Sequence, residues 1–188
     1  MDKMRDIDIR NSLMDKLNIQ NKGHDYLIIP EMVVCDGESR VDIAVANGNL
    51  YGYEIKSDVD TLDRLEIQKQ SYNRTFDKVF IVVGSKFEKI ISEHVPDWWG
   101  IYVAYYDKNK EVKIKERKRG RKNENVSAEA LLELLWREEV ATLLKQYGVK
   151  SISGKNRRIL RKMAIDNIPF EIIRNYTRET LKSRTEWR

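Results

Sequence analysis

The 188-residue chain is 41% hydrophobic and 35% charged, with a net charge of +5, which is typical of a soluble globular protein and excludes a largely disordered one. Its apolar runs fall short of the ~20 residues that span a bilayer, its N-terminus lacks a signal-peptide core, and its single cysteine, Cys35, excludes an intrachain disulfide. We therefore expect a cytoplasmic protein without a membrane segment, built as one full-sized domain with a small addition.

The periodicity of apolar residues predicts an α/β fold with a mixed sheet. Apolar, β-branched runs predict strands at 26–34, 40–46, 49–56, 78–84, 101–106 and 111–115. Helical spacing and capping residues predict helices at 3–19, from the polar break at 57–61 to about Asn73, and at 87–94. Asn47-Gly48 is typical of a two-residue hairpin turn, so the chain should reverse between the second and third strands.

From Ser127 onward the pattern is helical throughout. Ser127 is a candidate cap for one helix that ends at Gly148, and two further helices are expected at about 155–166 and 169–183. The chain is therefore expected to divide into a core, residues 1–124, and a basic helical subdomain, residues 125–188.

Basic residues are concentrated in two segments. Residues 151–188 contain ten Lys or Arg against four Asp or Glu, and residues 113–122 contain seven against one. Such clusters favour a polyanionic partner, because contacts with phosphates release condensed counterions. A solvated loop and a solvated helix face would have the same composition, so charge alone leaves both interpretations open.

Three residues on neighbouring predicted strands form the candidate active site. Asp42 lies in an otherwise apolar strand, and Glu54 and Lys56 are two residues apart on the next, so these two project from the same face. With a two-residue turn at Asn47-Gly48, Asp42 would lie opposite Tyr53. A bulge or a longer loop is therefore needed to bring Asp42 and Glu54 onto one face.

The chemistry of these residues suits a divalent metal ion. Two carboxylates and a backbone carbonyl, here that of Ile55, are ligands that Mg²⁺ or Mn²⁺ prefers. Such an ion polarises a phosphodiester and activates water, while a lysine orients or deprotonates that water. The alternative is two structural ion pairs, Glu54 with Lys56 and Asp42 with Arg40. A short D…ExK match is common by chance, so its surroundings decide its weight.

Gln68 and Tyr72 share one face of the helix that follows the third strand. The arrangement resembles the PD-(D/E)XK, or restriction-endonuclease-like, nuclease superfamily, and in particular its RecB-like members, which carry a Q-x-x-x-Y motif at this place. The resemblance implies that Asp42 and Glu54 bind the metal, that Lys56 is catalytic, and that Gln68 and Tyr72 complete the site.

Two features depart from the superfamily pattern. Val41 stands where the family name has proline, although many members vary there. Members often carry a further glutamate on the first helix; Glu31 is the best-placed candidate, but it lies within the strand predicted at 26–34.

A second resemblance runs through about residues 25–188. It rests on Glu31, Arg40-Val-Asp-Ile-Ala-Val, Gly52-Tyr-Glu-Ile-Lys-Ser-Asp58, Asp60-Thr-Leu-Asp-Arg-Leu65, Trp98-Trp-Gly100 and Leu134-Leu-Trp-Arg-Glu138. These segments resemble an uncharacterised bacterial family known only by a locus tag, which is usually placed in the same superfamily. The resemblance implies a fold and an active site but no biological substrate.

Several residues outside the motif are candidates for contacts with nucleic acid. Arg40 and Arg64 are placed to hold a phosphate, although pairing with nearby Asp residues is an equal alternative. Trp98 and Trp99 are better explained by core packing than by base stacking, and Asp58 and Asp60 by capping than by metal binding. The basic residues expected to contact the DNA backbone are Lys155, Arg157, Arg158, Arg161 and Lys162.

The leading hypothesis is an endo- or exodeoxyribonuclease that depends on Mg²⁺ or Mn²⁺ and acts on DNA, with RNA not excluded. The alternative is a non-catalytic nucleic-acid-binding or interaction protein on the same fold. A third hypothesis is the hydrolase part of a larger assembly, with a protein partner or as a homodimer.

Overall fold

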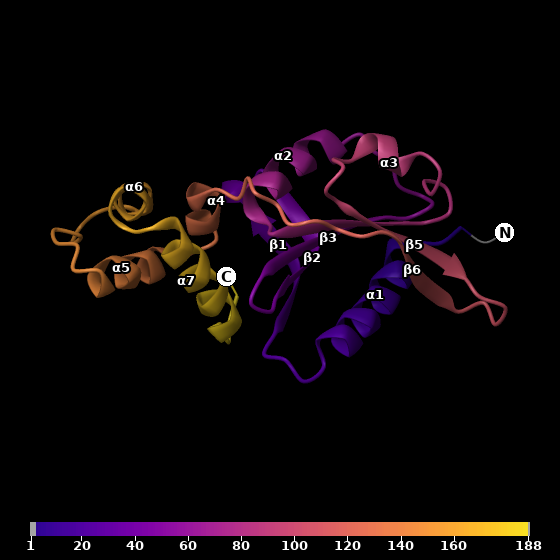
Figure 1. Ribbon diagram of the computed structural model, residues 1–188, viewed down its shortest axis with the longest axis horizontal. Coiled ribbons are helices and arrows are strands. Elements are labelled where there is room, and N and C mark those ends of the chain that lie inside the picture. The colour runs from indigo at the N-terminus through magenta and orange to yellow at the C-terminus, as the bar shows by residue number, and fades with distance from the viewer. Residues whose placement is uncertain (1–2, 188) are drawn as a thin grey trace.

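The computed structural model describes residues 3–187, which form a six-stranded mixed sheet with helices on both faces (Figure 1). The strands lie side by side in chain order: β1 Leu27–Val34, β2 Ser39–Ala46, β3 Leu50–Lys56, β4 Lys78–Val83, β5 Gly100–Tyr106 and β6 Val112–Lys118. The central pairs β3–β4 and β4–β5 are parallel, and the other pairs are antiparallel. The predicted α/β class is confirmed.

The helices agree with the predicted order but not with every boundary. Their bounds are α1 Asp6–Asn21, α2 Leu65–Thr75, α3 Ile91–His94, α4 Ala128–Glu133, α5 Arg137–Gln146, α6 Arg157–Asn167 and α7 Phe170–Ser183. The helix expected after the 57–61 break begins later, because the Asp60 carboxylate accepts hydrogen bonds from the backbone and hydroxyl of Ser57 and holds that segment in a turn.

The single helix predicted from Ser127 to Gly148 is wrong, because the chain breaks between α4 and α5. Trp136 has an extended backbone, with φ −70° and ψ 158°, and therefore cannot continue α4. Its backbone N–H donates to Glu139 Oε2 over 2.6 Å, which begins α5 with a side-chain cap. Leucines on both helices reach one core, and this explains why the apolar pattern looked continuous.

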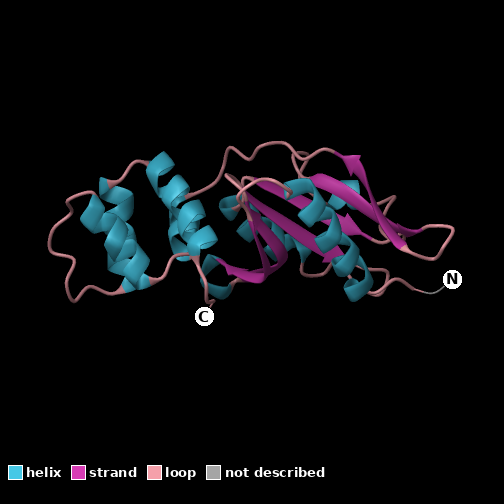
Figure 2. Cartoon of the chain, turned by 90° about the horizontal axis from the view of Figure 1, so that it is seen from below, coloured by secondary structure: helices cyan, strands magenta, loops and turns pink. Residues whose placement is uncertain are grey.

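The sheet separates two hydrophobic clusters. On one face, α1 packs Ile9, Leu13 and Leu17 against strand residues such as Ile43 and Val82. Helices α2 and α3 cover the other face, and the C-terminal helices join the same hydrophobic cluster from one end of the sheet (Figures 1 and 2). The central strand β4 is therefore apolar on both sides, as its sequence predicted.

The C-terminal helices are fixed to the sheet by a buried ion-pair cluster. Asp77, which precedes β4, lies 2.5 Å from Arg174 and 2.6 Å from Arg178, both on α7. Leucines of α4, α5 and α7 join the cluster that covers β1 to β5, so packing is continuous across residue 125. Within residues 3–187, no helix has the length and apolar character needed to cross a membrane.

Candidate active site

The loop between β2 and β3 determines which residues of the two strands face each other. Ala46 pairs with Leu50, so the loop contains three residues, Asn47–Asn49. The predicted two-residue turn is therefore wrong. Gly48 does adopt the left-handed conformation expected of this position, with φ 90°, and the backbone N–H of Asn47 donates to the carbonyl of Asn49.

The longer loop has the effect that the candidate site needs. Ile43 and Tyr53 are the last paired residues of β2 and β3, and the next pair in that register is Asp42 and Glu54. At this point a side chain replaces the backbone acceptor, because the N–H of Ile55 donates to Asp42 Oδ2 over 2.7 Å. The strand ends line a pocket of about 530 Å³ that contains both carboxylates.

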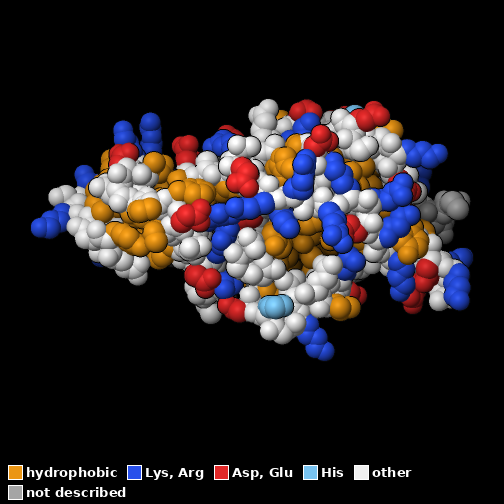
Figure 3. Space-filling view, in the orientation of Figure 1, with side chains coloured by type: hydrophobic (Ala, Val, Ile, Leu, Met, Phe, Trp, Pro, Cys, Tyr) orange, Lys and Arg blue, Asp and Glu red, His pale blue; other side chains and the backbone are white. Residues whose placement is uncertain are grey.

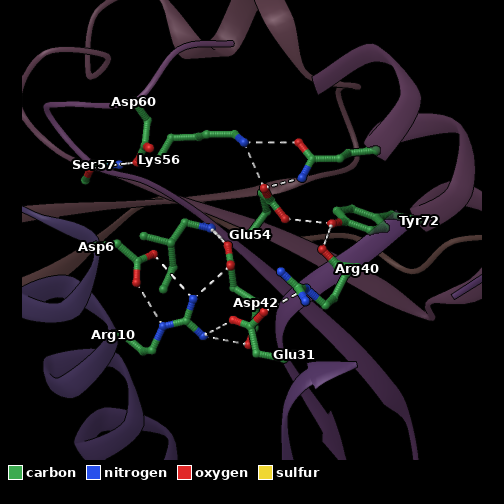
Figure 4. A network of polar contacts seen from close by, with 12 residues as sticks. Asp6, Arg10, Glu31, Arg40, Asp42, Glu54, Lys56, Ser57, Asp60 and Tyr72 are labelled. Atoms are coloured by element: carbon green, nitrogen blue, oxygen red, sulfur yellow. Dashed lines mark hydrogen bonds and ion pairs between the residues drawn. The ribbon is translucent and has the colours of Figure 1, made fainter. Parts of the chain in front are cut away.

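Glu54, Lys56, Gln68 and Tyr72 form one hydrogen-bonded unit between β3 and α2 (Figure 4). Glu54 Oε1 lies 2.9 Å from Lys56 Nζ and accepts from Gln68 Nε2 over 2.5 Å. Lys56 Nζ donates to the other end of the same amide, Gln68 Oε1, over 3.1 Å. All four residues are buried, so these contacts hold the Glu54 and Lys56 side chains in fixed positions.

Tyr72 completes this unit from the second turn of α2. Its hydroxyl lies 2.7 Å from Glu54 Oε2 and 2.9 Å from the carbonyl oxygen of Arg40, and its single proton can be donated to either acceptor. Burial, and then the charge of Glu54, raises the pKa of the Tyr72 hydroxyl, which therefore stays protonated. The structure thus brings together the residues of the predicted Q-x-x-x-Y motif and the predicted E-x-K motif.

Asp42 belongs to a second cluster, centred on Arg10 of α1, which the sequence analysis did not identify. The guanidinium of Arg10 lies 2.9 Å from Asp6 Oδ1, from Glu31 Oε1 and from Asp42 Oδ1 (Figure 4). It also donates to the backbone carbonyl of Asp42 over 2.9 Å. The only signal in the sequence was the i, i+4 spacing of Asp6 and Arg10, which is common on helices.

The Asp42 carboxyl has an unusual pKa for a side chain that faces a guanidinium. Burial and then the charge of Glu54 raise the pKa of Asp42 from its usual 3.8 to about 7. The Ile55 N–H and Arg10 lower it, but by less. Perturbed carboxyl groups in a pocket are typical of functional sites.

Glu31 reaches the same pocket from β1. It lies within the strand that the sequence predicted, and it has a left-handed backbone conformation with φ 54°. Regular pairing of β1 with β2 is interrupted at Glu31 and Asp42, between the pairs Pro30–Ile43 and Met32–Val41. Its carboxylate is held by Arg10 and, over 2.8 Å, by Arg40 Nε.

The oxygen donors fit a divalent ion in kind, since Asp42, Glu54, Glu31 and Ile55 all line one pocket. They do not fit it in arrangement, because among residues 3–187 no three His, Cys, Asp or Glu side chains converge as metal ligands do. Glu54 turns toward Lys56 and α2, whereas Asp42 turns toward Arg10 and α1 (Figure 4). A metal ion would bring these carboxylates together only after side-chain movement.

The predicted phosphate-binding arginines lie at this pocket. Arg40 and Arg64 are both exposed and both line it. Arg40 pairs with Glu31 rather than with Asp42, so the alternative pairing of Asp42 with Arg40 is wrong. The alternative pairing of Glu54 with Lys56 is present and coexists with the predicted site.

The basic residues predicted to contact DNA, which lie in α6 and just before it, differ in their exposure to solvent. Arg158 and Lys162 are exposed, whereas Arg161 is buried and pairs with Asp36 over 2.6 Å. Arg157 also contacts Asp36, over 3.2 Å, and Lys155 is half-buried. Arg161 therefore lies outside the exposed surface that a contact with DNA requires, and it joins α6 to the turn before β2.

Lys and Arg side chains are nevertheless numerous on the surface. In the face shown in Figure 3 they cross the middle of the molecule and alternate with acidic and hydrophobic patches.

Two other candidate residues have structural roles. Trp99 is fully buried and donates to Asn73, which agrees with core packing. Asp58 accepts from the backbone N–H groups of Met4 and Lys86, so it joins three segments of chain rather than capping α2.

Comparisons with known proteins give a consistent match at the family level. The family model described as Bacteriophage P4 protein cII matches residues 1–187. Protein cII of Enterobacteria phage P4 is 32% identical over 181 residues, which cover 96% of this chain and 68% of that protein. A solved structure of a protein of unknown function from Silicibacter pomeroyi covers 81% of this chain and 98% of its own, at 16% identity and a TM-score of 0.46.

The last similarity is too weak to establish a shared fold or function. The first two extend through the sheet and the C-terminal helices alike, so the motif residues and the basic helices fall within one matched region. The chain belongs to the bacteriophage P4 protein cII family.

Proposed function

We propose that this protein is a metal-dependent hydrolase of DNA phosphodiester bonds with a PD-(D/E)XK active site. The observation that carries the proposal is the joint placement of Asp42, Glu54 and Lys56 at one pocket, with Gln68 bonded to both Glu54 and Lys56. An ion pair that served stability alone would not require an opening to solvent or a second carboxylate beside it.

Each residue has a role that follows from its position. Asp42 and Glu54 would hold Mg²⁺ or Mn²⁺ by their carboxylate oxygens, and the ion would polarise the phosphodiester and activate water. Lys56 Nζ, held by Gln68, orients the attacking water and offsets the charge that develops on the phosphate. Arg40 and Arg64, at the exposed part of the pocket, hold the flanking phosphates.

The alternative is a non-catalytic nucleic-acid-binding protein on the same fold. One observation favours it: Arg10 already pairs with Asp42 and Glu31, so both carboxylates have a cationic partner without a metal ion. Calorimetric titration with Mn²⁺ separates the two proposals. Binding that disappears in Asp42→Asn supports the nuclease, and the absence of any binding supports the alternative.

Activity is tested with single- and double-stranded DNA and with RNA, in Mg²⁺, in Mn²⁺ and in EDTA. We expect cleavage of DNA with either ion and none in EDTA. Lys56→Met, which keeps the length of the side chain without its charge, should abolish cleavage while the protein stays folded by circular dichroism.

Lys89→Met is the matched control, because it removes the same charge from an exposed position outside the pocket. It should cleave at the wild-type rate. Cleavage by Lys56→Met at that same rate would show that the activity arises at another site or from a contaminant. Glu54→Gln provides a second inactive variant in case the buried methionine disturbs folding.

A further inference from the structure

Arg10 lies beside the pocket residues Asp42 and Glu31 and contacts both. Its guanidinium contacts one carboxylate from α1, one from β1 and one from β2, each over 2.9 Å. The side chains of Arg10 and Asp42 are each only 19% exposed, so this contact is weakened less by solvent than the contacts with the more exposed Asp6 and Glu31. Three acidic groups from three elements therefore meet at one positively charged side chain.

Both oxygens of Asp42 are engaged in this arrangement. Oδ1 faces Arg10, and Oδ2 accepts from the backbone N–H of Ile55. A divalent ion on Oδ1 would lie beside a guanidinium, and two like charges at that separation repel each other strongly in a partly buried site. Metal binding to Asp42 and the present position of Arg10 exclude each other.

The charge of the cluster leads to the same conclusion. Four carboxylates face three cationic side chains, a net charge of −1; they are Asp6, Glu31, Asp42 and Glu54 against Arg10, Arg40 and Lys56. With Arg10 paired to Asp6 alone, Glu31, Asp42 and Glu54 face only Arg40 and Lys56, so the site keeps a negative charge that a divalent ion would offset.

If the Arg10 side chain leaves Asp42, its guanidinium can remain paired with Asp6. Asp6 lies one turn earlier on α1, pairs with Arg10 in the i, i+4 arrangement and is partly exposed. A rotation of the long side chain away from Asp42 would therefore leave the guanidinium paired.

We propose that Arg10 is a built-in counter-ion of Asp42 and Glu31 that competes with the divalent ion, so that metal binding requires Arg10 to leave Asp42. The proposal rests on the proposed function in one respect, that Asp42 is a metal ligand. Arg10 thereby sets the metal concentration at which the site is loaded.

The test is calorimetric titration of the intact chain with Mn²⁺, which measures binding without activity. Arg10→Met should bind Mn²⁺ more tightly than the wild type, on the order of ten-fold, or about 1.4 kcal/mol. Lys16→Met, which removes the same charge from the other end of α1, should bind as the wild type does.

A second measurement uses thermal unfolding. Arg10→Met should lower Tm in EDTA, because Asp42 loses its cationic partner and Glu31 keeps only Arg40, and the difference from the wild type should shrink in saturating Mn²⁺. Arg10→Lys keeps the charge but not the planar fork, so its Mn²⁺ affinity should lie between the other two.

The outcomes separate this inference from the proposed function. A folded Arg10→Met that binds Mn²⁺ no more tightly than the wild type overturns the inference, including the case in which neither protein binds. If the wild type nevertheless cleaves DNA, the proposed function stands without it. If only Arg10→Met binds, the inference holds and the nuclease proposal for the wild type fails.

Discussion

The side-chain amide of Gln68 donates to Glu54 Oε1 over 2.5 Å, and this contact joins the helix α2 to the strand that carries the candidate catalytic residues. The carbonyl end of the same amide accepts from Lys56. Gln68 therefore orients the side chains of Glu54 and Lys56 together, and we regard it as a positioning residue.

Replacing Gln68 by leucine should lower the rate of DNA cleavage by about 10- to 100-fold, as loss of a residue that supports metal ligands commonly does. The loss should lie in kcat, with KM nearly unchanged, because Gln68 acts on Lys56 and Glu54. Gln70→Leu, on the exposed side of α2, is the control and should leave both constants unchanged. A change in KM alone would contradict a positioning role.

Tyr72→Phe should destabilise the protein by about 1–2 kcal/mol, because Glu54 Oε2 and the Arg40 carbonyl lose a buried donor. Urea unfolding measures the change. Tyr26→Phe removes a hydroxyl that bonds Asn18 at the surface, so its effect should stay below about 0.5 kcal/mol. If the two substitutions lowered the free energy of unfolding equally, the buried contact with Glu54 would contribute no more to stability than the surface contact does.

Asp77→Asn should be among the most destabilising single changes, at about 3–5 kcal/mol, because it removes the buried carboxylate shared by Arg174 and Arg178 and leaves Arg174 only its pair with the exposed Glu171. Thermal and urea unfolding both report it. Asp25→Asn removes the carboxylate of an exposed pair with Lys182 and should have little effect. A mild effect of Asp77→Asn would mean that apolar packing alone holds α7 on the sheet.

The pairing of Asp36 should make stability depend on acid pH. The hydrogen bond from Arg161, and then the charges of Arg161 and Arg157, lower the pKa of Asp36 in the folded protein. A lowered carboxyl pKa stabilises the fold above the pKa of the unfolded chain, and this stabilisation is lost as pH falls through the folded value.

Urea midpoints measured from neutral pH downward should therefore fall less steeply in Asp36→Asn than in the wild type below about pH 4. At neutral pH the variant should be the less stable of the two. Parallel pH profiles for the two proteins would contradict this account.

Most of the fold followed from the sequence, because the information is local. The strand at 78–84 is marked by a continuous apolar run and the strand at 40–46 by an apolar run that Asp42 interrupts, and each was predicted to within one residue at either end. Glu54, Lys56, Gln68 and Tyr72 were placed together correctly, because a two-residue and a four-residue period decide which side chains share a face.

Features that depend on residues far apart in the chain could not be predicted from the sequence. Arg10 draws its partners Glu31 and Asp42 from two strands, and no pattern within α1 points to them. The break at Trp136 was hidden because leucines before and after it serve the same core. Burial of Arg161 was likewise invisible, since its partner Asp36 lies 125 positions earlier in the chain.

The three-residue loop at Asn47–Asn49 makes the candidate active site more sensitive to the length of this loop than to its sequence. Substituting Asn47 or Asn49 should leave the strand register unchanged, whereas deleting either residue would shift β3 by one position against β2. Because side chains alternate between the faces of a strand, that shift would turn Glu54 and Lys56 away from Asp42. Single-residue insertions and deletions in this hairpin should therefore disrupt the candidate site of this protein, even though the loop itself carries no chemistry.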